Sequence, residues 1–361
     1  MRHIGTIGWG FLFACSLSAK LAWGGAAPVE APVETLHYAS SVDRIQPLQV
    51  DVALIKDGRP KPVLVVMHGY GGNRGNMTAD LKAHAARGIV ALAPDMRGAG
   101  GSAGRFDSGG LEIHDILDAV LEVLKKYPQE TDPKNLNIVG YSGGGGNAIA
   151  CMVRFPDLFH SYTSFFGISD YAAWHRSGGR KDCNSKMEAA LGGPPDAKPE
   201  VYLARNFIPA AGNARCGSLH FCWDEQEKQC PPQMIEDFVA AYRQAGGTRA
   251  AVHVSKAGDK ARWTHGYRPA GNAADALFLP DVLAPKPKAP ALPPTGRLVV
   301  PGFLVTRHFA VWIGESKKGD VLGQVTVEYD LRGAQPVVKV IENAKQYAVT
   351  IEASPLAALP R

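Results

Sequence analysis

The stretch "IVGYSGGGG", residues 138–146, places Ser142 between a short apolar segment and a run of glycines. It contains the pattern G-x-S-x-G. The apolar residues before the serine favour a buried strand over 135–142, and the sequence after it favours a helix over 146–155. A serine on a sharp strand-to-helix turn is held in strained backbone geometry with its hydroxyl exposed at the end of the sheet. This context predicts a nucleophile.

Two other interpretations of the glycine run are excluded. A phosphate-binding loop needs Lys and then Ser or Thr after its last glycine, and Asn147 and Ala148 stand there instead. A flexible linker would not lie between an apolar strand and an apolar helix. The glycines are better explained as clearance around the turn, because a glycine has no Cβ that could collide with Ser142.

Strands and helices alternate on both sides of Ser142, which predicts an α/β fold with a doubly wound, mostly parallel sheet. The segment 35–55 is expected to add antiparallel edge strands. We expect strands over residues 62–72, 88–95, 135–142, 160–169, 218–223 and 249–258, and helices over residues 77–88, 111–127, 146–155 and 231–247.

Composition changes divide the rest of the chain. A catalytic domain is expected over residues 35–282, and its segment 171–216 breaks the alternation as a lid-like excursion. Residues 283–296 are rich in proline, alanine and lysine and are typical of a semi-rigid linker. Residues 297–361 contain short β-branched and aromatic runs, which predict a small β-rich domain with a thin core.

Residues 1–24 are typical of a signal peptide, with a basic start, an apolar core and small residues near the end. Lys20 ends the apolar run too early for a membrane span. We therefore expect export, to the periplasm or as a secreted protein. Lipid anchoring through Cys15 is the weaker alternative, because the bulky Phe13 fits a lipoprotein cleavage box poorly.

The charge of the chain is modest. The formal net charge is +5, no long block of Lys and Arg occurs, and a nucleic-acid partner has no support. The sequence leaves the oligomeric state open.

Four of the six cysteines cluster after residue 180, and an oxidising compartment would favour disulfides among them. No CxxC pair occurs, so a metal site is disfavoured. Cys151 is expected as a buried thiol on the helix after Ser142. A bond between Cys222 and Cys230 could fix the loop between them, but the pairing is open among Cys183, Cys216, Cys222 and Cys230.

A nucleophilic serine needs a base, and the base needs a group that orients it. On a sheet of this kind the order along the chain is Ser, then Asp or Glu, then His. His265 follows the last expected strand, and Asp224 ends the strand before it. The predicted catalytic residues are therefore Ser142, Asp224 and His265. Alternatives for the acid are Glu225, Glu227, Asp170 and Asp259.

Acyl transfer also needs donors for the developing oxyanion. The backbone N–H of Gly143, directly after the nucleophile, is the first expected donor. The second is the N–H of Tyr70 in the turn "HGYGGN", residues 68–73, which follows the first buried strand. This chemistry requires no metal and no cofactor.

Together these motifs resemble the α/β-hydrolase superfamily over about residues 35–280. The resemblance is nearest to the branch of prolyl-oligopeptidase-like and dienelactone-hydrolase-like enzymes, which includes secreted esterases. The segments that carry it are "HGYGGN" (68–73), "DMRGAGGS" (95–102), "TDPKNLNIVGYSGGGG" (131–146) and "WTHGY" (263–267). One departure concerns the acid, because "EQEKQCPP" after Asp224 is two residues longer than the usual gap to the proline.

The leading hypothesis is a secreted serine hydrolase of carboxylic esters, acting on small-molecule or polymer-borne substrates. Only about 35 residues separate the expected signal from the first buried strand, which leaves no room for the propeller of prolyl oligopeptidases. This disfavours the first alternative, a peptidase or amidase. A second alternative is a surface or glycan-binding protein whose β-rich domain presents an aromatic platform, although core positions are favoured for Phe303, Phe309, Trp312 and Tyr329.

Overall fold

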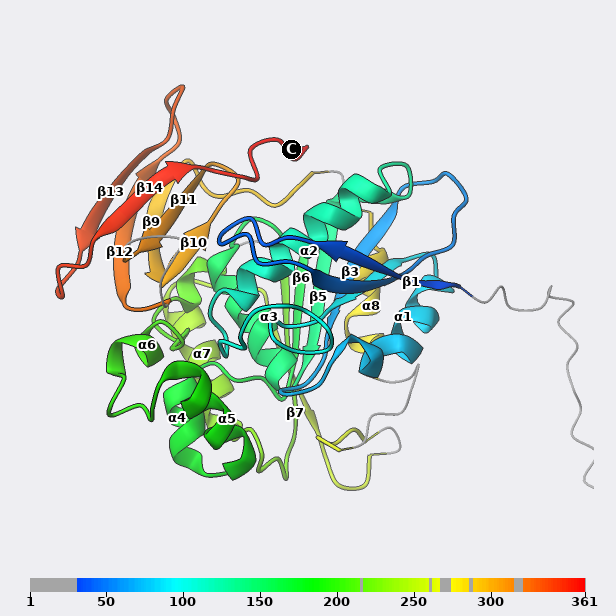
Figure 1. Ribbon diagram of the computed structural model, residues 1–361, viewed down its shortest axis with the longest axis horizontal. Helices are drawn as coiled ribbons and strands as arrows, with labels where there is room; N and C mark the ends of the chain where they lie inside the picture. The colour runs from blue at the N-terminus through cyan, green and yellow to red at the C-terminus, as the bar shows by residue number, and fades with distance from the viewer. Residues whose placement is uncertain are drawn as a thin grey trace, which may run out of the picture.

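The central feature of the fold is an eight-stranded sheet in the order β1-β2-β4-β3-β5-β6-β7-β8 (Figure 1). The strands β1 and β2 are antiparallel to each other, β2 is antiparallel to β4, and the remaining neighbours are parallel. The predicted α/β class is thereby confirmed. The strands are β1 (Val33–Tyr38), β2 (Leu48–Ala53), β3 (Lys61–Met67), β4 (Val90–Pro94), β5 (Thr131–Tyr141), β6 (Ser161–Phe165), β7 (Ser218–Asp224) and β8 (Ala250–Ser255). The computed structural model describes residues 31–214, 217–259, 262–266, 274–285, 288–314 and 321–360.

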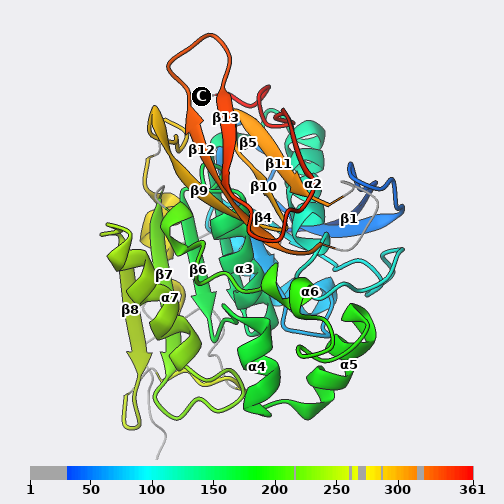
Figure 2. The same cartoon turned by 90° about the vertical axis from the view of Figure 1, so that its left-hand side faces the viewer.

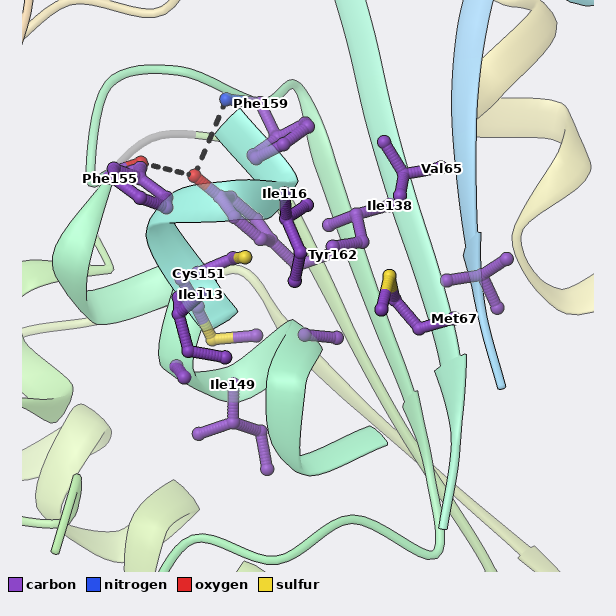
Figure 3. Close-up of a cluster of buried hydrophobic side chains, with 14 of the residues drawn as sticks. Val65, Met67, Ile113, Ile116, Ile138, Ile149, Cys151, Phe155, Phe159 and Tyr162 are labelled. Atoms are coloured by element: carbon purple, nitrogen blue, oxygen red, sulfur yellow. Dashed lines mark hydrogen bonds between the residues drawn. The ribbon is translucent and has the colours of Figure 1, made fainter. Parts of the chain in front are cut away.

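Helices cover both faces of this sheet (Figures 1 and 2). On one face, Ile113 and Ile116 of α2 and Ile149 of α3 lie among apolar side chains of β3 and β5 (Figure 3). In α2, apolar residues three or four positions apart form the stripe that buries against the sheet. The helices of this layered part are α1 (Thr78–Ala85), α2 (Glu112–Lys126), α3 (Gly143–Arg154), α7 (Gln233–Gln244) and α8 (Leu279–Leu283), with short turns η1 (Arg74–Met77) and η3 (Asp275–Leu277).

The segment between β6 and β7 leaves the sheet and returns to it. It folds into α4 (Tyr171–Ser177), α5 (Lys181–Leu191), α6 (Pro199–Leu203) and the turn η2 (Ala211–Asn213). The figures show α4 and α5 together beyond the end of the sheet to which the arrows of β6 and β7 point (Figures 1 and 2). Because catalytic groups of such sheets lie at the carboxyl ends of the strands, these helices border the site.

The C-terminal region is β-rich. It contains two three-stranded antiparallel sheets, β10-β11-β14 and β13-β12-β9, and residues of both sheets share one apolar core. Phe303, Phe309, Trp312 and Tyr329 are all buried, so they form core rather than an exposed platform. The strands are β9 (Thr295–Pro301), β10 (Phe303–Val305), β11 (Phe309–Ile313), β12 (Gln324–Asp330), β13 (Val337–Glu342) and β14 (Val349–Ala353).

A buried arginine joins this β-rich region to the layers of the α/β domain. Arg154, the last residue of α3, donates to the carbonyl oxygens of Pro301, Gly109 and Ala204 at 2.7–3.0 Å. Its guanidinium also lies 4.4 Å from the ring centroid of Phe303. The small β-rich region therefore gains stability from the larger core beside it.

The predicted disulfides are not found among the described cysteines. Cys151, Cys183, Cys222 and Cys230 are buried free thiols, so the bond that could have joined Cys222 and Cys230 is not formed. Cys15 and Cys216 lie outside the described residues, as does the predicted signal peptide. Among the described helices, none combines the length and the apolar character needed to cross a membrane.

Candidate active site

Ser142 stands on the turn between β5 and α3 with a φ of 57°, a conformation that residues other than glycine rarely adopt. The glycines around it are required by close backbone contacts. A Cβ on Gly140 would lie 1.9 Å from the carbonyl oxygen of Gly144, and one on Gly144 would lie 2.5 Å from that of His68. Gly145 is as restricted, because its Cβ would lie 2.5 Å from the Phe165 oxygen. The glycine run therefore packs the turn between β3 and β6.

His265 reaches Ser142 from the loop after β8. Its Nε2 lies 2.9 Å from the Ser142 Oγ. The imidazole is mostly buried and packs against the ring of Phe166, with 5.0 Å between the centroids. The predicted contact between these two side chains, 123 positions apart in the chain, is thus found.

The carboxylate beside His265 belongs to Glu227. Its Oε2 lies 3.0 Å from His265 Nδ1, and its Oε1 accepts the backbone N–H groups of Gln229 and Cys230 at 2.6 and 2.9 Å. Burial of Glu227 favours its neutral form, but the hydrogen bonds from His265 and the backbone outweigh this effect and hold its pKa below the usual value. Glu227 is therefore an ionised, fixed partner for the imidazole.

Asp224 does not contact His265, which corrects the prediction for the acid. Its two oxygens accept from Nε and Nη2 of Arg262, both at 2.8 Å, and Oδ1 also accepts the N–H of Gln226. The hydrogen bonds from Arg262 lower the pKa of Asp224. Asp224 ends β7 with its carboxylate bound to Arg262. The turn after β7 then places Glu227 beside His265.

The three other carboxylates weighed for this role accept backbone N–H groups, and Glu225 accepts that of Ala257 in the loop after β8. Asp170 caps α4 by accepting the N–H groups of Ala172 and Ala173. Asp259 accepts the N–H of Lys256 within its own loop. The long spacing in "EQEKQCPP" was the signal that could have shifted the prediction from Asp224 to Glu227.

The backbone at Tyr70 and Gly143 forms the predicted anion-binding corner. A Cβ on Gly143 would lie 2.6 Å from the Tyr70 nitrogen, so only glycine permits this approach. Within the described part of the chain, neither N–H group donates to a protein acceptor. The Tyr70 side chain is fixed by a 2.8 Å hydrogen bond between its hydroxyl and Ser108 Oγ. Two free donors thus lie beside the nucleophile, which is the arrangement that stabilises an oxyanion.

The central part of the chain matches a known protein family. The profile of the prolyl oligopeptidase family matches residues 76–259, half of the chain, including Ser142 and Glu227. The chain belongs to the prolyl oligopeptidase family. Its α/β-hydrolase resemblance is therefore confirmed, and it is an enzyme of the serine hydrolase type. A search of curated proteins found no match.

Solved structures support the same fold. A Mycobacterium tuberculosis puromycin-hydrolysing peptidase matches with a TM-score of 0.57 at 22% identity, over 70% of this chain and 39% of that one. A Pyrococcus horikoshii acylaminoacyl peptidase matches with 0.52 at 20%, over 66% and 38%. A putative dipeptidyl aminopeptidase IV from Bacteroides ovatus matches with 0.54 at 21%, over 69% and 34%. The chain thus spans less than half the length of each.

This family member has a pocket of about 460 Å³ beside the anion-binding corner. Tyr70 and Gly143 line it, so a group bound there lies next to the reacting carbonyl. Much of the remaining wall is apolar and comes from the loop after β4 and from α5, with Met96, Ala99, Phe106, Ala189 and Ala190. The excursion predicted over 171–216 thus contributes to the substrate side of the site.

Proposed function

We propose that this protein is a serine peptidase or amidase that cleaves amide bonds of small acylated substrates through an acyl-enzyme. The observation that supports this proposal most is the hydrogen-bonded series Ser142–His265–Glu227, with distances of 2.9 and 3.0 Å, beside two free backbone donors. The sequence favoured carboxylic esters. The family and the peptidases among its structural neighbours favour the amide alternative instead.

Each group has a defined task in the proposed reaction. His265 Nε2 takes the proton of Ser142 Oγ as the oxygen attacks the carbonyl carbon, and it then gives this proton to the leaving amine. Glu227 keeps the proton on Nδ1 and stabilises the imidazolium that forms. The N–H groups of Tyr70 and Gly143 donate to the oxyanion, and each such donor stabilises the transition state by about 3 kcal/mol. Water then releases the acyl group by the same steps.

Paired substrates test the proposal. The purified enzyme would be assayed on p-nitroanilides and p-nitrophenyl esters that carry the same acyl groups. We expect turnover of both, because activated esters are easier substrates, and we expect the anilide activity to disappear in Ser142→Ala. Ester turnover without any anilide turnover would instead support the carboxylic ester hydrolase predicted from the sequence. Unchanged turnover in Ser142→Ala would exclude both.

Export remains part of the proposal, supported by the basic start and apolar core of residues 1–24. Expression of the full chain followed by N-terminal sequencing of the mature product tests it. We expect cleavage within "AWGGAA", residues 22–27. Retention of Met1 in the cell interior would contradict export, and a lipid on Cys15 would support the lipoprotein alternative.

A further inference from the structure

The turn that carries the Tyr70 N–H is rich in glycine. Gly69, Gly71 and Gly72 surround the tyrosine, and the φ of Gly71 is 72°, in the left-handed region. Yet a donor to an oxyanion must be held within about 0.5 Å of its productive position. In a turn of this composition, the Tyr70 side chain is the part through which neighbouring elements can fix the position of the N–H.

The Tyr70 side chain is anchored by two rings and one hydrogen bond. The ring meets those of Phe106 and Trp174 edge-on, with centroid distances of 5.1 and 5.2 Å. Burial raises the pKa of Tyr70, so the phenol keeps its proton. Ser108, whose Oγ lies 2.8 Å away, is the only described residue that forms a hydrogen bond with this hydroxyl. Because a hydrogen bond fixes both a distance and a direction, Ser108 sets where the side chain ends.

Ser108 is itself held in an uncommon conformation. It is fully buried and has a φ of 50°, in the left-handed region that serine rarely adopts. Such a residue persists only where the surrounding contacts enforce its conformation. Arg205 supplies these contacts, because its Nε donates to the Ser108 carbonyl oxygen and its Nη2 donates to that of Asp107, both at 2.8 Å. Two successive carbonyl groups are thus directed at one guanidinium.

Arg205 also binds the β-rich region. It follows α6 in the excursion between β6 and β7 and is only 2% exposed. Its Nη1 donates to the carbonyl oxygens of Val201 in α6 and of Val321 in the β-rich region, both at 2.8 Å. In both views α6 lies between the β-rich strands and the pair α4 and α5 (Figures 1 and 2). Since the N–H directions of a guanidinium are rigid, Arg205 holds three parts of the chain in fixed relation.

We propose that Ser108 and Arg205 are positioning residues for the oxyanion site, and that through them the β-rich region supports catalysis as well as folding. Hydrogen bonds connect Val321 to Arg205, Arg205 to Ser108, and Ser108 to the side chain of Tyr70. The Tyr70 N–H is the proposed oxyanion donor, so the series ends at the reacting atoms. This inference rests on the proposed function, because the position of Tyr70 matters only if an oxyanion forms beside Ser142.

Ser108→Ala is the diagnostic variant, because it removes only Oγ and keeps the carbonyl group that Arg205 binds. The measured quantities are kcat and KM for a p-nitrophenyl ester. We expect kcat to fall about three- to tenfold, the factor of one hydrogen bond, with KM unchanged. The loss falls on kcat because the oxyanion exists in the transition state and not in the bound substrate.

A trifluoromethyl ketone gives a readout that a loss of folded protein does not move. Ser142 Oγ adds to its carbonyl carbon, and the former carbonyl oxygen then carries the negative charge of an oxyanion. Its inhibition constant is measured on active enzyme only, so a partly unfolded preparation keeps the wild-type value. We expect the constant of Ser108→Ala to rise by about the same factor by which kcat falls.

Ser161→Ala is the matched control. Ser161 is also buried, and its Oγ donates to Asn137 Oδ1 at 2.7 Å, but it begins β6 at the end of the sheet away from the site. The control should lower the melting temperature and leave kcat and the inhibition constant unchanged. An equal loss of kcat in both variants would overturn the inference. Unchanged kcat and inhibition constant in folded Ser108→Ala would also overturn it, while leaving the proposed reaction of Ser142 intact.

Tyr70→Phe removes the same hydrogen bond from its other end and keeps the test decisive if Ser108→Ala does not fold. If the bond acts by positioning, Tyr70→Phe, Ser108→Ala and the double variant should lose similar factors in kcat, because each lacks the same single bond. A much larger loss in Tyr70→Phe than in Ser108→Ala would show that the hydroxyl acts on the substrate directly. That result, or an unchanged kcat in Tyr70→Phe, would contradict the positioning role.

Arg205→Lys tests the connection to the β-rich region. Lysine keeps the charge but lacks the planar fork that reaches Ser108 and Val321 together. We expect kcat to fall about tenfold or more, with a parallel rise in the inhibition constant of the ketone. Arg176→Lys is the control, because Arg176 forms an exposed pair with Asp196 at 2.8 Å, and it should match wild type. Wild-type kcat and inhibition constant in Arg205→Lys would exclude a catalytic contribution of the β-rich region through this arginine.

Discussion

The two sides of the catalytic centre are held in place by different kinds of interaction. On the side of Ser142, main-chain atoms touch main-chain atoms: Gly140 meets Gly144, and Gly144 meets the end of β3. On the other side, the loop after β7 is held by side-chain charges: Asp224 pairs with Arg262, and Glu227 pairs with His265. The nucleophile is fixed by backbone packing, and its base is fixed by ion pairs.

This difference determines how each side should fail. A Cβ added to Gly140 would lie 1.9 Å from the Gly144 oxygen, and closely packed main chain cannot move aside for it, so changes in the turn should act on folding. A side-chain pair can lose its charge and keep its shape, so changes in the acid loop should act on turnover. The following experiments test this division, in order of decreasing effect.

Gly140→Ala should have the largest effect. Its Cβ would overlap the Gly144 oxygen, and we expect no soluble folded protein. Expression yield and circular dichroism measure this. Gly333→Ala is the control, because its Cβ would only meet Gln335 at an ordinary 3.4 Å. A folded Gly140→Ala variant with a wild-type melting temperature would show that backbone packing does not fix the Ser142 turn.

Glu227→Gln should fold and lose turnover. The amide can no longer stabilise the imidazolium or hold the proton on Nδ1, so kcat should fall about 10²–10⁴-fold with little change in KM. Steady-state kinetics on a p-nitrophenyl ester measure it. A loss of less than about fivefold would mean that another carboxylate orients His265.

Asp224→Asn should have a much smaller effect on turnover. We expect kcat within about tenfold of wild type, since Asp224 contacts Arg262 and the N–H of Gln226 but not His265. If this variant instead loses as much kcat as Glu227→Gln, the sequence-based assignment of the acid is reinstated.

The stability of the same variant has a defined pH dependence. Arg262 lowers the pKa of Asp224 in the folded protein, so the ion pair contributes stability above the unfolded pKa of about 4. That contribution is lost as the pH falls through the lower folded value. At pH 7 the melting temperature of Asp224→Asn should be about 2–4 °C below wild type, and the difference should vanish in acid. A difference that persists in acid would show that the pair is not its cause.

Reduction should have the smallest effect. Cys222 and Cys230 are free thiols at the two ends of the acid loop, so charges rather than a disulfide hold it. Adding dithiothreitol should move the melting temperature by less than about 1 °C. A fall of several degrees would reveal a disulfide and restore the sequence-based expectation.

Several features of the site followed from local sequence patterns. The order of strands and helices repeats over short segments, and so the position of Ser142 between β5 and α3 could be predicted from adjacent residues. Tyr70, Gly143 and His265 followed because each stands at a fixed place relative to a strand end. Their contacts are set by where the strands of a parallel sheet terminate.

The acid could not be chosen in this way. Asp224 and Glu227 are three positions apart on one turn, and both precede His265 at plausible distances. Which of the two contacts the imidazole depends on Arg262, because this arginine lies on another loop and pairs with Asp224. The disulfide prediction was wrong for a related reason, because clustering of cysteines along the chain does not by itself bring their thiols into bonding geometry.

The sequence by itself determined the fold class, the nucleophile and its histidine, because hydrophobic periodicity and the glycine requirement of a tight turn are local. Only the tertiary structure decided that Glu227 meets His265, and that His68, Glu112 and Asn147 share one pocket. Glu227 and His265 come from the loops after β7 and β8, and their side-chain directions depend on packing between elements. The three pocket residues follow β3, begin α2 and lie in α3. Contacts of this kind leave no pattern along the chain, because they depend on how separate elements pack in space.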